Sequence, residues 1–160
     1  MCYIDFMKKY EILEHKADLK IRAFGKTKEE LFLNMLLGMT NGLRPKIKNK
    51  KSKTKLSFMK AKVKKRTNSS SPIKKIKVKS LNSETLLVDF LSEVLYLIQV
   101  NREIYNDIKF KKCTNTEIEG KLLGQKAERF GEDIKAVTYH NLDVHQEKDG
   151  TWQATVLFDI

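Results

Sequence analysis

The end of the chain carries the pattern that most constrains its fold. Two runs of alternating apolar and polar residues, Ile134–His145 and Thr151–Phe158, flank a turn sequence that contains Asp149-Gly150. Such alternation around an Asp-Gly step is the strongest short-range signal for a β-hairpin. One face of the second run collects four apolar residues, Trp152, Ala154, Val156 and Phe158. The sequence therefore predicts a terminal hairpin with one buried face.

Length and composition bound the class of protein. The chain has 160 residues, of which 41% are apolar, and this is enough for one domain with its own core. No apolar run has the length that crosses a bilayer, and the N-terminus lacks the apolar core of a signal peptide. Cys2 and Cys113 have no CxxC partner, which favours free thiols in a reducing compartment. We therefore expect a cytoplasmic protein with no membrane partner.

The net charge of +12 comes from one segment. Between Arg44 and Lys79 there are 16 Lys or Arg and no Asp or Glu, whereas the rest of the chain has 16 basic and 20 acidic residues, a net charge of −4. Residues 45–72 are rich in Lys, Ser and Asn, a composition that buries too little apolar surface to order itself. We expect a single domain over residues 1–160 with a basic, flexible insertion at about 45–72. Within it, residues 56–63 form at most a weak strand.

The first part of the chain predicts two strands and a helix. Lys9–Ile12 and Leu19–Phe24 have the pattern of strands. Thr27 is the expected N-cap of the helix, with Glu30 reaching back to it in a capping box. Gly42 is the expected stop. Between them, apolar residues recur at helical spacing: Leu31, Phe32, Met35, Leu36 and Met39.

A second helix has the strongest apolar stripe in the chain. It follows a strand that contains Ile73, Ile76 and Val78, and Asn82 or Ser83 is its expected N-cap. The stripe consists of Leu86, Leu87, Phe90, Leu91, Val94, Leu95 and Ile98. Two more strands, Ile104–Phe110 and Thr116–Leu123, precede the terminal hairpin. This order of elements predicts an α+β fold in which two helices pack on a mostly antiparallel sheet.

Familiar catalytic signatures are absent from the sequence, which contains no GxSxG, Walker loop, HExxH or paired CxxC. His140 and His145 are five residues apart on an expected strand, so alternation puts them on opposite faces and favours two ordinary histidines. Asp89 and Glu93 share one face of a helix. Such a pair is more often a solvated face or a set of hydrogen-bond acceptors than the border of a site.

Asp18 is a candidate of another kind. It lies with His15 in an expected loop, where an isolated aspartate is most often a turn residue. The chain ends in Asp159 and the carboxylate of Ile160, which places two carboxylates at the end of a strand. If the two regions meet, Asp18, Asp159 and Ile160 supply hard oxygen ligands, which suit Ca²⁺ or Mg²⁺ rather than zinc. Spacing alone leaves open whether they meet.

Three blocks of the sequence resemble the signature blocks of the archease family. YEILEHKADLKIRAFGKTKEELF resembles that family's strand, His-x-Ala-Asp turn, second strand and capped helix. ETLLVDFLSEVLYL resembles its Leu-Leu-Val-Asp helix, and IKAVTYHNLDV with GTWQATVLFDI resembles its last strands and its Asp-Ile terminus. The blocks occur in the family's order and cover most of the chain outside residues 45–72.

The resemblance implies both a fold and a function. The fold is built from nested strand-helix-strand-strand units. Archease is an accessory protein that promotes guanylylation and repeated turnover of the GTP-dependent tRNA-splicing ligase, and it is not itself known as an enzyme. The matching motifs imply Asp18, Asp159 and Ile160 as ligands of a divalent ion, Ca²⁺ or Mg²⁺, and Lys135 as a functional lysine. Four further residues are candidates to border the site: His15, Asp89, Glu93 and His140.

The chain departs from the family pattern in two places, and other functions stay open. Its basic insertion is longer, and its segment Gly124–Asp133 is shorter, with Gln125 where a glutamate is common. An RNA-binding module could use residues 44–79, although Phe58 is their only aromatic residue and no RRM, KH or OB signature accompanies them. A stand-alone metallohydrolase would need a base or nucleophile within the acidic cluster, which the sequence does not offer.

Overall fold

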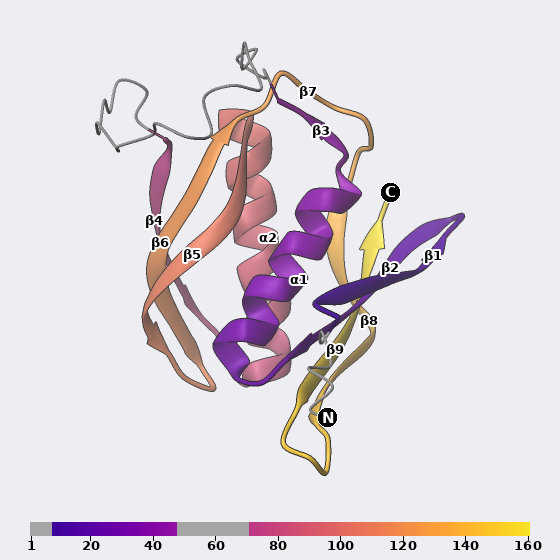
Figure 1. Ribbon diagram of the computed structural model, residues 1–160, viewed down its shortest axis with the longest axis vertical. Helices are drawn as coiled ribbons and strands as arrows, with labels where there is room; N and C mark the ends of the chain where they lie inside the picture. Colours follow the sequence, from indigo (N-terminus) through magenta and orange to yellow (C-terminus); the bar gives the residue numbers. More distant parts are fainter. Residues whose placement is uncertain (1–7, 48–70) are drawn as a thin grey trace, which may run out of the picture.

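Two helices lie side by side, with one β-sheet on each side of them (Figure 1). The computed structural model describes residues 8–47 and 71–160. Most of the expected insertion, including the weak strand at residues 56–63, lies outside the described residues, so RNA binding through it stays a prediction. All strand pairings are antiparallel among the residues described. The α+β class is confirmed, although the strands form separate sheets instead of one.

The first sheet contains both ends of the described chain. Its strand order is β1-β2-β9-β8, and α1 follows β2 directly. The bounds are β1 (Tyr10–His15), β2 (Asp18–Gly25), α1 (Lys28–Gly42), β8 (Ala136–Gln146) and β9 (Trp152–Asp159). The terminal strand β9 therefore lies inside the sheet, between β2 and β8, with the expected hairpin on one side of it.

The second sheet is formed by the middle of the chain. Its order is β4-β6-β5, and α2 connects β4 to β5. The bounds are β4 (Ile73–Lys79), α2 (Ser83–Asn101), β5 (Glu103–Cys113) and β6 (Glu117–Lys126). This strand-helix-strand-strand unit is inserted between α1 and β8 of the other unit. Both units place their last strand between the first and the second, which confirms the nested architecture.

A short third pairing joins the two units. Strand β3 (Pro45–Lys46), the first two residues of the expected insertion, pairs with β7 (Arg129–Phe130). The segment Gly124–Asp133 is thus not a plain loop, because β6 runs on to Lys126 and β7 follows. Neither helix in the described residues has the length and apolarity that crossing a bilayer requires.

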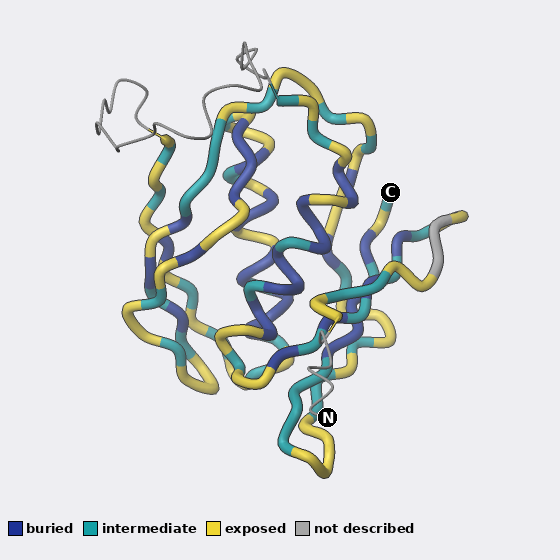
Figure 2. The backbone as a smooth tube through the Cα atoms, in the orientation of Figure 1, coloured by how far each residue is buried: buried dark blue, intermediate teal, exposed yellow. Residues whose placement is uncertain are grey.

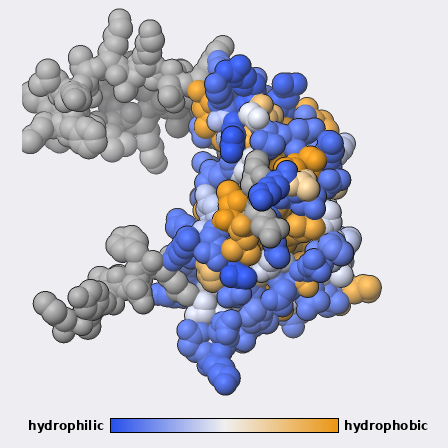
Figure 3. Space-filling view, turned by 90° about the vertical axis from the view of Figure 1, so that its right-hand side faces the viewer, coloured by the Kyte–Doolittle hydropathy of each residue, from blue (hydrophilic) through white to orange (hydrophobic). Residues whose placement is uncertain are grey.

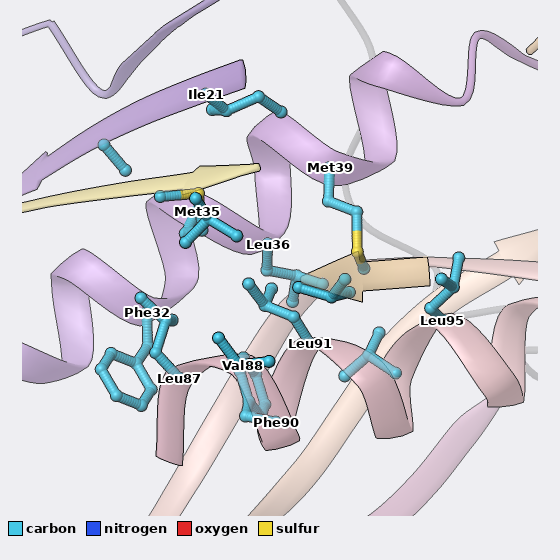
Figure 4. Packing of buried hydrophobic residues seen from close by; sticks show 14 of the residues in the cluster. Ile21, Phe32, Met35, Leu36, Met39, Leu87, Val88, Phe90, Leu91 and Leu95 are labelled. Carbon is cyan, nitrogen blue, oxygen red and sulfur yellow. The ribbon is translucent and has the colours of Figure 1, made fainter. Parts of the chain in front are cut away.

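The core lies between the helices and the inner faces of the two sheets (Figure 2). Both expected helical stripes are buried throughout. Phe32 of α1 stacks on Phe90 of α2, with ring centroids 5.9 Å apart. Figure 4 shows Met35, Leu36 and Met39 of α1 in the same cluster as Leu87, Leu91 and Leu95 of α2. Burying a side chain of this size stabilises the fold by about 1.5–3 kcal/mol.

The first helix begins at the expected residue, and Gly42 at its end has a packing role. Thr27 is its N-cap and accepts a hydrogen bond from the Glu30 backbone N–H at 3.2 Å. The Glu30 carboxylate accepts from the backbone N–H of Lys26, one residue before the cap, and not from Thr27. Gly42 is the last helical residue, and a Cβ there would lie 2.7 Å from a δ-methyl of Leu19. The glycine therefore allows close packing against β2.

The terminal hairpin has the expected turn and an unexpected bulge. Gly150 takes φ +90°, and the Glu147 N–H donates to the Thr151 carbonyl at 2.7 Å. Between Thr138 and Asp143 the register of β8 shifts against β9, so that several extra residues protrude. Because this bulge breaks the alternation, the spacing of the two histidines of β8 does not determine which faces they occupy.

The cap of α2 gives a test of the local structure. Asn82 is the N-cap, its side chain accepts from the Thr85 N–H at 2.9 Å, and Thr85 Oγ1 accepts in return from the Asn82 N–H. Asn82→Ala should lower the free energy of unfolding by about 1 kcal/mol, because it leaves a helix N–H without its partner. Chemical denaturation measures this change. Ser92→Ala, at an exposed position of the same helix, is the control and should stay within about 0.5 kcal/mol. Equal effects of both changes would contradict the capping role.

Candidate functional site

Three segments distant in sequence meet at one corner of the first sheet. Asp159 of β9 pairs directly with Asp18 of β2 on one side and with Ala136 of β8 on the other. The Lys135 backbone N–H donates to the Asp159 carbonyl at 2.7 Å. The structure thus brings Asp18, Lys135 and Asp159 together. Asp18 is the first residue of a strand and does not lie in a loop as expected, because its pairing with Asp159 extends the strand by one residue.

The two aspartates lie on the face of the sheet that points away from the helices. Their neighbours Leu19 and Phe158 are fully buried, and side chains alternate along a strand. Asp159 is exposed and Asp18 is half-buried. Directly opposite residues of an antiparallel pair have Cβ atoms about 4.5–5.5 Å apart, so the two carboxylates repel each other across the strands. This side of the molecule is largely hydrophilic, with a few apolar patches (Figure 3).

The donors at this corner fit a hard divalent cation. Within residues 8–47 and 71–160, no group of three or more His, Cys, Asp or Glu side chains could hold a metal ion. A site here therefore needs a third donor besides Asp18 and Asp159, and the resemblance to archease implies Ile160 for that place. The carboxylate oxygens of the two aspartates are donors that suit Ca²⁺ or Mg²⁺. A cation would also relieve the repulsion between the two aspartates.

Lys135 lies in a groove between the second half of α2 and the start of β8. The groove has a volume of about 260 Å³ and is lined by Ser92, Leu95, Tyr96, Gln99, Lys135, Ala136 and Val137. The Gln99 side chain donates to the Ile134 carbonyl at 3.0 Å and ties the residue before Lys135 to the helix. Tyr96 is 57% exposed beside it. Sequence reasoning missed Tyr96 and Gln99, although both lie off the apolar stripe of α2.

Asp89 has a structural task. Its carboxylate accepts hydrogen bonds from the Ser80 hydroxyl, at 2.7 Å, and from the Tyr139 hydroxyl. The second bond raises the pKa of Tyr139, because ionisation of the phenol would lose it. Asp89 therefore ties α2 to the end of β4 and to the bulge of β8, as a hydrogen-bond acceptor. Glu93, one turn further along, is exposed.

The remaining candidates are spread over the first unit. His15 ends β1, where its backbone pairs with Leu19, and His140 is exposed in the bulge of β8. His145 lies between two carboxylates, with Nδ1 2.9 Å from Asp143 and Nε2 2.8 Å from Glu147. The structure places neither His140 nor His145 in a strand pairing with Asp18. His145 thus belongs to a polar network of its own, away from Asp18 and Asp159.

Cys113 at the end of β5 is a free cysteine. It is half-buried, and this burial raises its pKa to about 11. The nucleophilic thiolate is therefore scarce near neutral pH. The second cysteine, Cys2, lies outside the described residues.

The fold defines a class of small α+β proteins built from two nested strand-helix-strand-strand units. The solution structure of protein 1598 of Methanobacterium thermoautotrophicum has a TM-score of 0.64 and 26% identity, with 96% of this chain and 100% of that chain covered. The crystal structure of an archease, possible chaperone, from Thermotoga maritima has a TM-score of 0.60, with 94% and 96% covered. At 19% identity, the second likeness shows the fold alone.

Sequence comparison identifies the family within this class. Residues 10–160 match the model of the Archease protein family (MTH1598/TM1083). Protein archease of Methanosarcina barkeri is 35% identical, over 96% of this chain and 97% of that protein. Protein archease of Pyrococcus furiosus is 30% identical, over 96% and 100%. The chain belongs to the archease family.

The network around His145 predicts a measurable titration. The hydrogen bond to Glu147 is the largest cause that raises the pKa of His145 above 6.5, and Asp143 adds to it. A raised pKa in the folded state gives stability that is fully present below the unfolded value and lost as pH rises through the folded one. A titration of His145 by NMR should therefore show a pKa above 6.5. Glu147→Gln should lower it more than Asp143→Asn does, and Glu84→Gln should leave it unchanged. A parent pKa at 6.5 would contradict the network.

Proposed function

We propose that this protein is an accessory activator of the GTP-dependent tRNA-splicing ligase, promoting ligase guanylylation and multiple turnover without being an enzyme itself. The observation that carries the proposal is the pairing of Asp18 with Asp159 beside Lys135. These are the residues that the resemblance to archease implies as functional. Family membership supports the role, and a related structure is described as a possible chaperone, which also fits an accessory task.

The acidic corner has a task that suits nucleotidyl transfer. Asp18 and Asp159, with the terminal carboxylate of Ile160, would hold a divalent cation, and the sheet pairing fixes the two strands that carry them. When bound, such an ion supplies positive charge that offsets the charge of a triphosphate. Because the sheet already fixes the strands, binding of a partner at this corner would cost little conformational entropy.

Lys135 would add a second positive contact. Its backbone is held by Asp159 and its neighbour Ile134 by Gln99, while the side chain is exposed. A mobile ammonium on a fixed backbone can meet a phosphate oxygen of a nucleotide in the ligase. The exposed Tyr96 in the same groove is of the residue type that is enriched in protein interfaces. The net charge of −4 outside residues 44–79 suits docking to a basic, RNA-binding cleft.

The metal proposal predicts opposite effects with and without the ion. Asp159→Asn and Asp18→Asn should each remove the rise in thermal midpoint that Ca²⁺ gives the parent protein, with Mg²⁺ run in parallel. For the parent, an ion at a hundred times its Kd adds about 2.7 kcal/mol of stability. Without added metal both variants should be at least as stable as the parent, because the cross-strand repulsion is gone.

Asp143→Asn is the matched control, since it removes an exposed carboxylate elsewhere on the same sheet, and it should keep the full response. A residue added after Ile160 should weaken the response, because the terminal carboxylate becomes an amide. The metal site is wrong if Asp18→Asn and Asp159→Asn respond to the ion as strongly as the control does.

Substitutions of Lys135 distinguish an activator of the ligase from a passive scaffold. Lys135→Ala should leave the free energy of unfolding within about 0.5 kcal/mol of the parent and leave ligase binding near normal, while sharply reducing stimulated guanylylation of the cognate ligase. Lys135→Arg should restore activity only in part, since the guanidinium fork differs in size and shape.

Lys148→Ala, at an exposed position of the hairpin turn, is the control for lost surface charge and should activate like the parent. Binding and guanylylation are measured on the same samples, with and without this protein. Full activation by Lys135→Ala would show that the acidic corner alone accounts for the function. No stimulation by the parent protein would overturn the proposed function as a whole.

A further inference from the structure

Three lysines form a straight row across the second sheet. Lys121 of the central strand β6 pairs directly with Lys75 of β4 on one side and with Lys109 of β5 on the other. All three are exposed. Residues directly opposite in a sheet have Cβ atoms about 4.5–5.5 Å apart, and like charges at that distance destabilise the pairing. The sheet thus carries a concentrated positive charge at a cost to its own stability.

The two exposed-face glutamates of β6 form their ion pairs with other lysines. Glu117 pairs with Lys77 at 3.6 Å and with Lys112 at 2.7 Å. Glu119 pairs with Lys111 at 3.3 Å. Within the described residues, none of Lys75, Lys109 and Lys121 has a carboxylate in ion-pair distance. The row is therefore available to an external anion.

Protection of sheet edges does not explain the row. Lysines on edge strands hinder unwanted pairing with other chains, and this could account for Lys75 on β4 and Lys109 on β5, which are the two edges of the sheet. Lys121 lies on the central strand, where no edge needs protection. A neutral or acidic residue between two lysines would make the sheet more stable than Lys121 does. Lys121 therefore indicates a function other than stabilising the fold.

The row lies in a groove on the outer face of the sheet. The groove has a volume of about 760 Å³, and Lys77, Lys111 and Glu119 line it together with the three lysines. A groove admits a chain, whereas the plane of a bilayer meets a flat or convex surface. A positively charged groove that follows the phosphate backbone is the electrostatic element of single-strand binding.

We infer that this face of the β4-β6-β5 sheet binds the phosphate backbone of a single-stranded nucleic acid, with Lys75, Lys109 and Lys121 as the phosphate contacts. Two of these lysines belong to β5 and β6, outside the basic segment of the sequence. The inference is independent of ligase activation, because it concerns the other sheet and none of the residues at the acidic corner. RNA and DNA share the backbone that the row recognises.

The test compares the parent chain with the triple variant Lys75→Gln, Lys109→Gln and Lys121→Gln. Fluorescence anisotropy measures binding of labelled oligouridine and oligodeoxythymidine of about 12 nucleotides, between about 50 and about 200 mM KCl. Each phosphate contact on a single strand contributes about −0.7 to the slope of log affinity against log salt. The variant should therefore bind about tenfold more weakly at the lower salt, with a slope smaller in magnitude by about 2.

A second triple variant, Lys9→Gln, Lys26→Gln and Lys148→Gln, makes the same change in net charge at exposed positions elsewhere, and it should bind like the parent. Thermal unfolding should show the first variant to be as stable as the parent or more stable, because the repulsion is relieved. Equal slopes for parent and first variant, or equal losses in both variants, would overturn the inference. Displacement of the oligonucleotides by polyglutamate as effectively as by unlabelled oligouridine would also overturn it, in favour of an acidic protein.

Discussion

The structure depends on the place of β9 inside its sheet. The last strand of the chain pairs with β2 near the start and with β8 just before it, so the first unit closes only when the end of the chain is in position. Everything between α1 and β8 must fold as an insertion that brings these strands within reach. Closing so long a loop costs conformational entropy, and the buried faces of β2 and β9, with Leu19 and Phe158 fully buried, offset it. The same pairing makes Asp18 and Asp159 neighbours.

Local chemistry is what the sequence predicts well. The apolar stripe of α2 and the cap at Thr27 depend on residues a few positions apart, whose interactions are set by helical periodicity. The turn before Thr151 likewise needs only Gly150 at positive φ. The Glu30 contact was missed by one residue, because a flexible carboxylate reaches either of two adjacent N–H groups. The bulge of β8 had one signal, since Asn141 takes φ +52° and asparagine tolerates that region.

Non-local register is what the sequence does not predict. No residue near Asp18 indicates that Asp159 is its partner. Only the resemblance to archease implied that the two aspartates lie close together. The row of Lys75, Lys109 and Lys121 had no sequence signal either, because shifting one strand by a single residue would move its lysine to the other face. Register is set by the sum of buried contacts along each strand, as with Ile76, Ile118 and Ile108 on the inner faces, and no short motif records that sum.

The two nested units share a strand order, and each brings residues of like charge together at one place on its outer face. In one, the first and last strands bring two aspartates together at a corner; in the other, all three strands bring lysines together in a row. Like charges directly opposite in a sheet are destabilising, and an external ion of opposite sign would relieve each arrangement. The helices keep the two faces on opposite sides of the core (Figure 1), so that the proposed cation and the proposed polyanion would not compete for the same surface. The proposed role involves a nucleotide and a nucleic acid, and this separation would give each of them its own surface.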